Sequence, residues 1–443
     1  MRIQLPGDVK KIIQTLQEAG YEAYAVGGCV RDSLLGRIPS DWDITTSAEP
    51  AEVKRLFRRT FDTGIQHGTV TVLFDKTGYE VTTYRIDGRY EDGRHPAEVT
   101  FTPNLEEDLK RRDFTVNAMA YNDEAGLIDC FGGAEDLEKG VIRCVGEPAE
   151  RFHEDALRIM RAVRFAAQLD ARIEESTATA IRKLAPTLTR ISAERIQVEL
   201  VKLLISDHPE KMRDLYALGI TAVILPEFDR IMETDQNNPH HCYSVGEHTI
   251  HTLMNVENSK VLRLTMLFHD FGKAETRTTD EEGIDHFHGH PKISAQMAAG
   301  IMRRLKFDSD TMNRVCRLVE KHDLKVDPSA KAVRHAASGM GTDLFPLFLQ
   351  IKRADTMGQS DYMREEKLDR IRSVEQIYRN ILEQKECLNL KQLALNGRDL
   401  IALGVQPGQE MGDLLESMLQ MVLDDPARND RAFLTEYVKK LHQ

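Results

Sequence analysis

The sequence lacks long apolar runs and is poor in cysteine. No stretch of apolar residues reaches the roughly 20 that a membrane-spanning helix needs, and the N-terminal MRIQLPGDVKK has no apolar core like that of a signal peptide. The six cysteines are scattered and form no CxxC pair, which argues against a structural zinc site and predicts free thiols. We therefore expect a cytoplasmic protein that does not contact a membrane.

Positive charge is outnumbered by negative charge over the whole chain. The formal net charge of −12 for 443 residues argues against a nucleic acid as partner. Contacts with phosphates depend on local patches, however. Basic residues cluster in three places: Arg85, Arg89 and Arg94; Lys110, Arg111 and Arg112; and Arg158, Arg161 and Arg164. The net negative charge therefore does not exclude RNA as a partner.

The hydrophobic pattern divides the chain into a mixed part and a helical part. Apolar spacing predicts helices over 8–19 and 50–60, and YEAYAVGG predicts a strand that enters a glycine turn. Alternating residues over 68–74 and 79–85 predict a hairpin. From about residue 150 onward, strand-like runs almost vanish and apolar residues recur at helical spacing. A chain of this length predicts two to four domains.

The most informative segment is GGCVRDSLLGRIPSDWD, which begins at Gly27. Gly27 and Gly28 carry no Cβ and would let the backbone approach a triphosphate closely. Asp41 and Asp43 lie two residues apart, and at strand spacing both carboxylates would point to one face. Paired carboxylates suit Mg²⁺ held together with substrate phosphates. This is the arrangement of two-metal nucleotidyl transfer.

Other residues of the first part can complete this site. Glu80 lies on the predicted hairpin and is either a third metal-binding carboxylate or an exposed strand residue. The segment KRRDFTVNA places Arg111 and Arg112 beside Asp113. Two arginines suit a triphosphate, and we expect Asp113 to hold their guanidinium groups.

A third motif, EDALR, follows the mixed part. Asp155 and Arg158 lie three residues apart and would share one face of a predicted helix. One side chain offers acceptors and the other offers donors, so the pair can match the Watson–Crick edge of a base. The alternative is a surface salt bridge worth roughly a few tenths of a kcal/mol.

The second half contains histidines and aspartates in an ordered series. The series is His248, His269 with Asp270, His290, His322 and Asp355. Imidazole and carboxylate can bind Mn²⁺, Ni²⁺, Fe²⁺ or Zn²⁺. For any one of these residues alone, a buried histidine without a metal is the alternative. Their order resembles that of an HD-superfamily phosphohydrolase domain. This resemblance implies a metal site for hydrolysis of a phosphoester, with Lys273 as a ligand for the substrate phosphate.

These motifs resemble those of class II CCA-adding tRNA nucleotidyltransferases, in the poly(A) polymerase-like branch of the polymerase-β superfamily. The resemblance runs from Gly27 to near the C-terminus and is to the bacterial form with an HD domain. It implies an α+β fold with a polymerase-β-like nucleotidyltransferase head on a mixed sheet. The expected parts are the head (1–145), an all-α neck with the nucleotide-selection motif (146–225), an HD body (226–370) and a helical tail that docks tRNA (371–443).

The resemblance also implies roles for individual residues. Asp41 and Asp43 would be catalytic and bind Mg²⁺, with CTP, ATP and tRNA as substrates. The nucleotide site would comprise Gly27, Gly28, Arg31, Arg111, Arg112, Asp113, Asn117, Asp155, Arg158, Arg161 and Arg164. A transition metal such as Mn²⁺ or Ni²⁺ would be bound by His248, His269, Asp270 and Asp355, with His290 and His322 as further candidates. The segment from Ser192 to Glu199 resembles the next family motif and is expected to brace the neck.

One loop bears on the product of the reaction. The segment RIDGRYEDGRHP, from Arg85 to Pro96, lacks helical spacing and predicts a mobile loop. It resembles the flexible loop of full CCA-adding enzymes, with a DGR-P core at Asp92, Gly93, Arg94 and Pro96, and a plain surface loop is the alternative. Relatives that add only the two cytidines lack this core, so its presence favours complete CCA addition.

Three other functions stay open on the sequence. The first is a poly(A) polymerase of the same fold. The second is an HD phosphohydrolase whose head only binds RNA, and the third is a regulatory nucleotide-binding protein. The substrate and metal of the HD body and the oligomeric state do not follow from the sequence, and neither does a firm distinction between full CCA and A-only addition.

Overall fold

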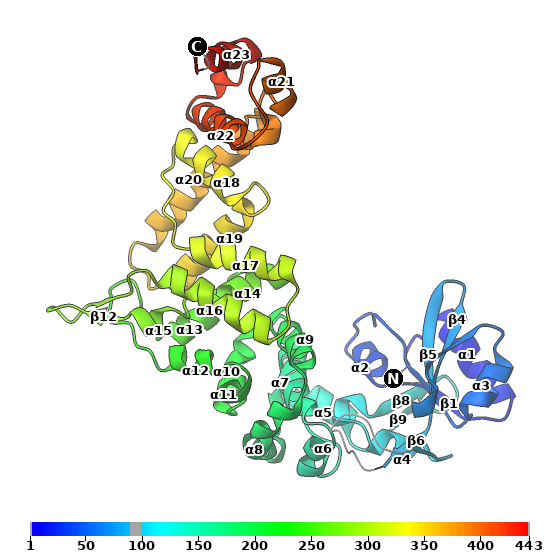
Figure 1. The fold of residues 1–443 in the computed structure, drawn as a ribbon. Coiled ribbons are helices and arrows are strands. Elements are labelled where there is room, and N and C mark those ends of the chain that lie inside the picture. The colour runs from blue at the N-terminus through cyan, green and yellow to red at the C-terminus, as the bar shows by residue number, and fades with distance from the viewer. Residues whose placement is uncertain (1, 89–98, 442–443) are drawn as a thin grey trace. The chain divides into compact units, whose positions relative to one another are not determined.

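The computed structural model describes residues 2–88 and 99–441 and divides into two compact units (Figure 1). The first unit is Met1–Pro226 and the second is Glu227–Gln443. The first unit combines a sheet with helices and the second is almost wholly helical. The predicted α+β fold is therefore confirmed. Among the described residues, no helix is both long and apolar enough to cross a membrane.

A seven-stranded mixed sheet forms the core of the head. Its strand order is β3-β4-β5-β2-β1-β8-β9, with β2 and β5 parallel and the other neighbours antiparallel. The strands are β1 (Ala23–Val26), β2 (Ile44–Thr46), β3 (Thr60–Gly64), β4 (Thr69–Phe74), β5 (Thr77–Thr83), β8 (Met119–Asn122) and β9 (Gly126–Asp129). The predicted strand before the glycine turn is β1, and the predicted hairpin is β4 with β5, so both predictions are confirmed.

Short helices accompany the sheet. They are α1 (Gly7–Glu18), α2 (Gly28–Leu34), α3 (Pro50–Leu56), α4 (Leu105–Lys110) and α5 (Gly133–Glu138). Helix α1 confirms the prediction and buries Val9, Ile12, Ile13 and Leu16 at helical spacing. The helix predicted over 50–60 ends at Leu56, because Phe57 is extended and buried and the chain then enters β3.

The predicted loop from Arg85 to Pro96 begins as a strand. Strand β6 (Arg85–Asp87) pairs antiparallel with β7 (Val99–Phe101), so backbone pairing overrides the loop pattern at its first three residues. The DGR-P core, Asp92, Gly93, Arg94 and Pro96, lies outside the described residues.

Helices dominate the rest of the first unit. They are α6 (Pro148–Glu154), α7 (Leu157–Leu169), α8 (Glu175–Leu184), α9 (Ala193–Leu204), α10 (Met212–Ala217) and α11 (Thr221–Ile224), beside the small pair β10 (Val141–Ile142) and β11 (Arg172–Ile173). Helices α7 and α9 pack together, and the buried ion pair between Arg164 and Glu199, 2.7 Å, joins them.

The second unit is a helical array with one small strand pair. Its helices are α12 (Pro226–Met232), α13 (Val245–Met254), α14 (Lys260–Phe268), α15 (Lys273–Thr276), α16 (His290–Arg304), α17 (Ser309–Lys321), α18 (Ala330–Met340), α19 (Phe345–Gly358), α20 (Arg364–Glu383), α21 (Gly397–Ala402), α22 (Gln409–Asp424) and α23 (Arg431–Leu441). The strands are β12 (Thr278–Thr279) and β13 (Asp285–His286). Helix α20 runs across residue 370, where the sequence predicts the end of the body. All six cysteines are free thiols, as predicted.

Candidate nucleotide and metal sites

The glycine turn lies between β1 and α2. Gly27 has φ 82°, a left-handed conformation that favours glycine, and its N–H donates to the Met119 carbonyl at 3.1 Å. A Cβ at Gly27 would lie 3.1 Å from a terminal nitrogen of Arg112. The turn therefore needs glycine for its backbone conformation and for its close approach to this arginine.

The two aspartates lie directly before β2. The prediction that Asp41 and Asp43 are strand residues is wrong, because pairing with β5 begins at Ile44. The register pairs Ile44 with Val81, so the preceding positions, Asp43 and Glu80, are neighbours at the same end of the parallel pair. The structure thus brings Glu80 beside the predicted metal-binding pair.

Electrostatics link the three carboxylates with Arg112. Desolvation raises the pKa of Asp43, and Glu80 and Asp41 add to that rise, while Arg112 opposes it. The Asp43 side chain is partly desolvated but remains exposed to solvent. It therefore lies in a recess that solvent reaches. When the pKa of a carboxylate is raised in this way by other carboxylates, a nearby cation stabilises its charged form.

The head carboxylates fit Mg²⁺ as an incomplete ligand set. Among the described residues, both groups of side chains whose ligand atoms lie within 4.8 Å of one another belong to the second unit. Mg²⁺ usually takes one or two carboxylates and completes its shell with waters and substrate phosphates. Exposed Asp41 and Asp43, next to an arginine, provide that kind of open site.

The arginines of KRRDFTVNA are held by a residue that the sequence analysis missed. The prediction that Asp113 holds Arg111 and Arg112 is wrong. Asp108 on α4 is fully buried and accepts from Arg111 at 2.9 Å and from Arg112 at 3.3 Å. Thr45 on β2 also donates to Asp108, at 3.0 Å. The sequence did contain a signal for this contact. Asp108 precedes Arg111 by three residues and Arg112 by four, and side chains at these spacings are neighbours on a helix.

Asp113 instead joins the head to the neck. It accepts from Arg161 of α7 at 2.7 Å and from Asn117 at 3.1 Å, and Arg31 of α2 donates to Asn117 at 2.6 Å. Burial alone would raise the pKa of Asp113, but Arg161, Arg158 and the Asn117 amide hold it well below its usual value. The structure thus gathers four predicted residues, Arg31, Asp113, Asn117 and Arg161, into one network.

An aromatic ring organises the same arginines. Phe165 on α7 is 5% exposed, and the guanidinium carbons of Arg31, Arg161 and Arg164 lie 5.1, 5.3 and 3.6 Å from its ring centroid. Stacking on an aromatic face fixes the plane of a guanidinium group. The sequence analysis did not single out Phe165, because an apolar residue in an apolar helix face carries no distinguishing signal.

Asp155 and Arg158 do not form the salt bridge that was their alternative interpretation. Asp155 lies between α6 and α7, accepts from the Leu157 N–H at 3.0 Å and pairs with Arg195 at 2.6 Å. Arg158 pairs with Glu154 and donates to the Arg111 carbonyl at 3.0 Å. Each side chain is therefore oriented by a different partner.

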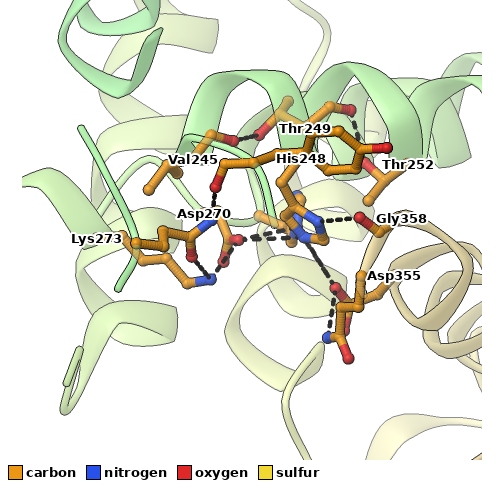
Figure 2. A network of polar contacts seen from close by, with 12 residues as sticks. Val245, His248, Thr249, Thr252, Asp270, Lys273, Asp355 and Gly358 are labelled. Carbon is orange, nitrogen blue, oxygen red and sulfur yellow. Dashed lines mark hydrogen bonds and ion pairs between the residues drawn. The ribbon is translucent and has the colours of Figure 1, made fainter. Parts of the chain in front are cut away.

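In the second unit, a buried cluster gathers around Asp270 (Figure 2). His248 Nε2 lies 3.0 Å from Asp355 and 3.5 Å from Asp270, and His269 Nε2 lies 3.3 Å from Asp270. His290 and His322 approach the other oxygen of Asp270, at 3.3 and 3.6 Å. Five of the six predicted side chains thus form two groups that share Asp270, and the sixth, Asp355, adjoins them through His248.

The four histidines present the same ring nitrogen to this cluster. In each, Nδ1 lies 2.7–3.0 Å from a backbone carbonyl, those of Gly358, Met266, Phe287 and Val319. A carbonyl only accepts, so Nδ1 carries the hydrogen and a neutral ring keeps its lone pair on Nε2. The Nε2 atoms face each other at 3.3 Å for His248 and His269 and at 3.2 Å for His290 and His322. Two Nε2 lone pairs that face each other are arranged so that both can bind one cation.

The carboxylates of the cluster are held in their charged form. Burial would raise the pKa of Asp270, but His269 and Lys273 hold it well below its usual value. Asp355 behaves in the same way, with His248 as its main partner. Lys273, predicted to bind a substrate phosphate, contacts Asp270 at 2.7 Å and Gln236 at 2.9 Å.

Three family models match successive parts of the chain. A poly(A) polymerase head domain matches residues 23–143, and an RNA- and SrmB-binding site of polymerase A matches residues 171–232. A tRNA nucleotidyltransferase domain 2 matches residues 276–438. With the mixed sheet and the carboxylates beside β2 and β5, these matches define the class: the chain is a nucleotidyltransferase with a head of the poly(A) polymerase type.

Whole-length relatives narrow this class. The chain is 35% identical over 438 residues to the CCA-adding enzyme of Pediococcus pentosaceus, covering 98% of each. It is 36% identical over 449 residues to that of Limosilactobacillus reuteri, covering 99% of this chain and 98% of the relative. The chain belongs to the family of CCA-adding enzymes.

Solved structures agree in fold. The CCA-adding enzyme of Bacillus stearothermophilus in complex with CTP is 29% identical, with a TM-score of 0.75 over 99% of this chain and 98% of that one. The Thermotoga maritima CCA-adding enzyme complexed with tRNA has a TM-score of 0.60 at 22% identity over the full length of both. The second likeness concerns the fold alone.

Proposed function

We propose that this protein adds C, C and A to the 3′ end of tRNA from CTP and ATP without a nucleic-acid template. One observation carries the proposal: the carboxylates at the start of β2 lie beside Glu80 and within the electrostatic reach of Arg112, which Asp108 holds next to the glycine turn. The family and the complexes of its relatives with CTP and tRNA support it.

Each group of the head has a distinct task in this mechanism. Asp41 and Asp43 would hold Mg²⁺, which supplies charge neutralisation and an activated 3′ hydroxyl when bound. Arg111 and Arg112 bind the triphosphate, and buried Asp108 keeps both guanidinium groups aimed at it. The Gly27 turn gives the phosphates access to this surface.

The neck would select the base. Asp155 offers acceptors and Arg158 offers donors to a Watson–Crick edge. Arg195 and Glu154 fix these two side chains independently, so the pair keeps its spacing without closing on itself. The loop that contains Asp92–Pro96 would help the pocket change from C to A.

Separate nucleotide additions distinguish this function from poly(A) polymerase. With CTP alone, tRNA that lacks CCA should gain two residues and stop. With ATP alone, tRNA that ends in CC should gain one residue and stop. A long adenosine tail in the second reaction would identify a poly(A) polymerase instead.

The second unit supports a further activity. We propose that it is an HD-type phosphohydrolase, because four histidine Nε2 atoms and two buried carboxylates gather in two adjoining groups that share Asp270. His248, His269, Asp270 and Asp355 would hold one transition-metal ion, and His290 and His322 would hold a second that shares Asp270. Such ions supply a bound water as nucleophile at neutral pH.

This activity is tested on the protein reloaded with Mn²⁺, Ni²⁺ or Co²⁺. Wild type should cleave p-nitrophenyl phosphate or a 2′,3′-cyclic phosphodiester, and His269→Ala should not. If both proteins are equally inactive in every metal, the second unit is a structural or tRNA-docking module.

A further inference from the structure

A second cavity adjoins the metal-binding residues of the second unit. One cavity of about 430 Å³ is lined by Asp270, His290 and His322. A neighbouring cavity of about 500 Å³, here called the α19–α20 cavity, lies mainly between those two helices. The two share five lining residues, namely His241, Asp323, Lys325, Asp355 and Gln359. A molecule at the metal cluster can therefore extend past Asp355 into the second cavity.

Basic side chains outnumber carboxylates by one in the lining of the α19–α20 cavity. Its lining includes Lys325, Lys352, Lys367 and Arg370. The carboxylates among its lining residues are Asp323, Glu366 and the metal-binding residue Asp355. At the metal cluster, Lys273, which contacts Asp270, and the bound ions would oppose the charge of a phosphoester. Lys352, Lys367 and Arg370 line only the α19–α20 cavity, whereas Lys325 lines both cavities, so three of the four cations face a different part of the bound molecule.

The same cavity has an apolar wall. Phe348 and Leu349 of α19 and Ile371 and Val374 of α20 line it, and all four are largely buried. Its volume lies within the range of about 300–1,000 Å³ that is usual for small-molecule sites. Cations beside an apolar wall suit a nucleotide, whose phosphate binds the former and whose base packs on the latter.

We infer that the α19–α20 cavity binds the nucleotide next to the phosphoester that is cleaved, so that the second unit acts on the end of an RNA chain in preference to a mononucleotide. This inference rests on the proposed phosphohydrolase function. The internal phosphodiester of the RNA end meets Lys325, Lys352, Lys367 and Arg370, and its base packs against Phe348 and Leu349.

A contact chain connects the two cavities. Lys367 donates to Gln359 at 2.7 Å, and the Gln359 amide lies 3.3 Å from both oxygens of Asp355. An anion that draws Lys367 into the cavity would therefore also affect the side chain that orients a metal ligand. For this reason, the variants that test the cavity leave Lys367 unchanged.

The test compares three substrates on the full-length, Mn²⁺-loaded protein. They are p-nitrophenyl phosphate, adenosine 3′-monophosphate and the dinucleotide ApAp, which ends in a 3′-phosphate. We expect ApAp to have the lowest KM, by roughly tenfold relative to the mononucleotide, as for one added contact to a charged group. The KM for ApAp should also rise more steeply with salt.

The double variant Lys352→Gln with Arg370→Gln should raise the KM for ApAp roughly tenfold relative to that for p-nitrophenyl phosphate. Arg353→Gln is the matched control, because Arg353 is an exposed residue of α19 that pairs with Glu375. It removes a positive charge outside the cavity and should change neither KM.

The outcomes separate this inference from the function on which it rests. If no phosphoester is cleaved in a His269-dependent way, the phosphohydrolase proposal fails. If p-nitrophenyl phosphate is cleaved but ApAp has no advantage, or the double variant changes both substrates equally, the cavity assignment alone is overturned. The bisphosphate pAp provides a third arm. A KM for pAp as low as that for ApAp would point to a free bisphosphate nucleotide as the substrate and would overturn the inference that the substrate is an RNA end.

Discussion

At the scale of single residues, the head works with charged side chains that buried neighbours hold in place. Asp108 positions Arg111 and Arg112, and Asp113 connects the head to Arg161. These carboxylates remain ionised because they are paired, since an unpaired charge in the same place would cost several kcal/mol. The carboxylates proposed to bind the metal, Asp41 and Asp43, are by contrast exposed to solvent.

Removing either exposed carboxylate should stop both nucleotide additions. Asp41→Ala and Asp43→Ala should each lower C and A incorporation by about 10³-fold or more, as when a charge-stabilising group is lost from an active site. The measurement is single-turnover incorporation into tRNA. A variant that still adds C at nearly the wild-type rate would show that the metal site is elsewhere.

Replacing Asp113 should loosen the junction of head and neck. Asp113→Asn leaves Arg161 without its charge partner and should lower the free energy of unfolding by about 1–3 kcal/mol. This loss is smaller than for a fully buried ion pair, because Arg161 is partly exposed and solvent screens it. The pKa of Asp113 is lower in the folded state than the unfolded value of about 3.9. Its contribution is therefore complete above that value and is lost as the pH falls through the folded pKa.

Urea unfolding at several pH values checks this prediction. The difference between wild type and Asp113→Asn should be constant near neutral pH and should shrink below about pH 4. Asp62→Asn is the control, because Asp62 forms an exposed pair with Lys54 and should contribute little. A difference that grows toward acid pH would contradict the assigned pKa direction.

Altering Arg158 should change which nucleotide enters. Arg158→Ala removes the donors of the proposed base-reading pair while Arg195 still holds Asp155. We expect the preference for CTP and ATP over UTP and GTP to relax, measured as the four kcat/KM values. If a folded variant keeps its nucleotide preference, Arg158 has only a structural role, through its contacts with Glu154 and Arg111.

At the scale of elements, the sequence predicted local patterns well and long-range partners poorly. Helix α1 and the β4–β5 hairpin follow from apolar spacing within one segment. Helix α3 stops early because Phe57 and β3 find partners elsewhere in the sheet, which no local window contains. The convergence of His290 and His322 on Asp270 is also long-range, so the sequence could name these residues but could not place them.

Shortening the segment between Asp87 and Pro96 should separate the two additions. One pocket must change its preference from C to A after two steps, and this charged, glycine-containing segment between β6 and β7 is the candidate for that change. We expect C addition to persist and the final A to be lost, measured on tRNA ending in C and in CC. Equal loss of both would indicate a general role in folding or RNA binding.

At the scale of the whole molecule, the two proposed activities belong to different compact units. The nucleotidyltransferase residues belong to the first unit and the histidine–aspartate cluster to the second. Hydrolysis of p-nitrophenyl phosphate should therefore survive Asp41→Ala and vanish in Asp270→Ala. It should also require a transition metal more than Mg²⁺, because imidazole ligands suit softer ions. Loss of hydrolysis in Asp41→Ala would show that the two units are coupled.

The most direct test of the account is incorporation of radiolabelled CTP and ATP into three tRNAs, which lack CCA or end in C or in CC. The account predicts that these tRNAs gain CCA, CA and A, and that no further nucleotide follows. Incorporation of only A, of only C, or of a long tail would contradict full CCA addition. The absence of any incorporation would contradict catalysis by the head.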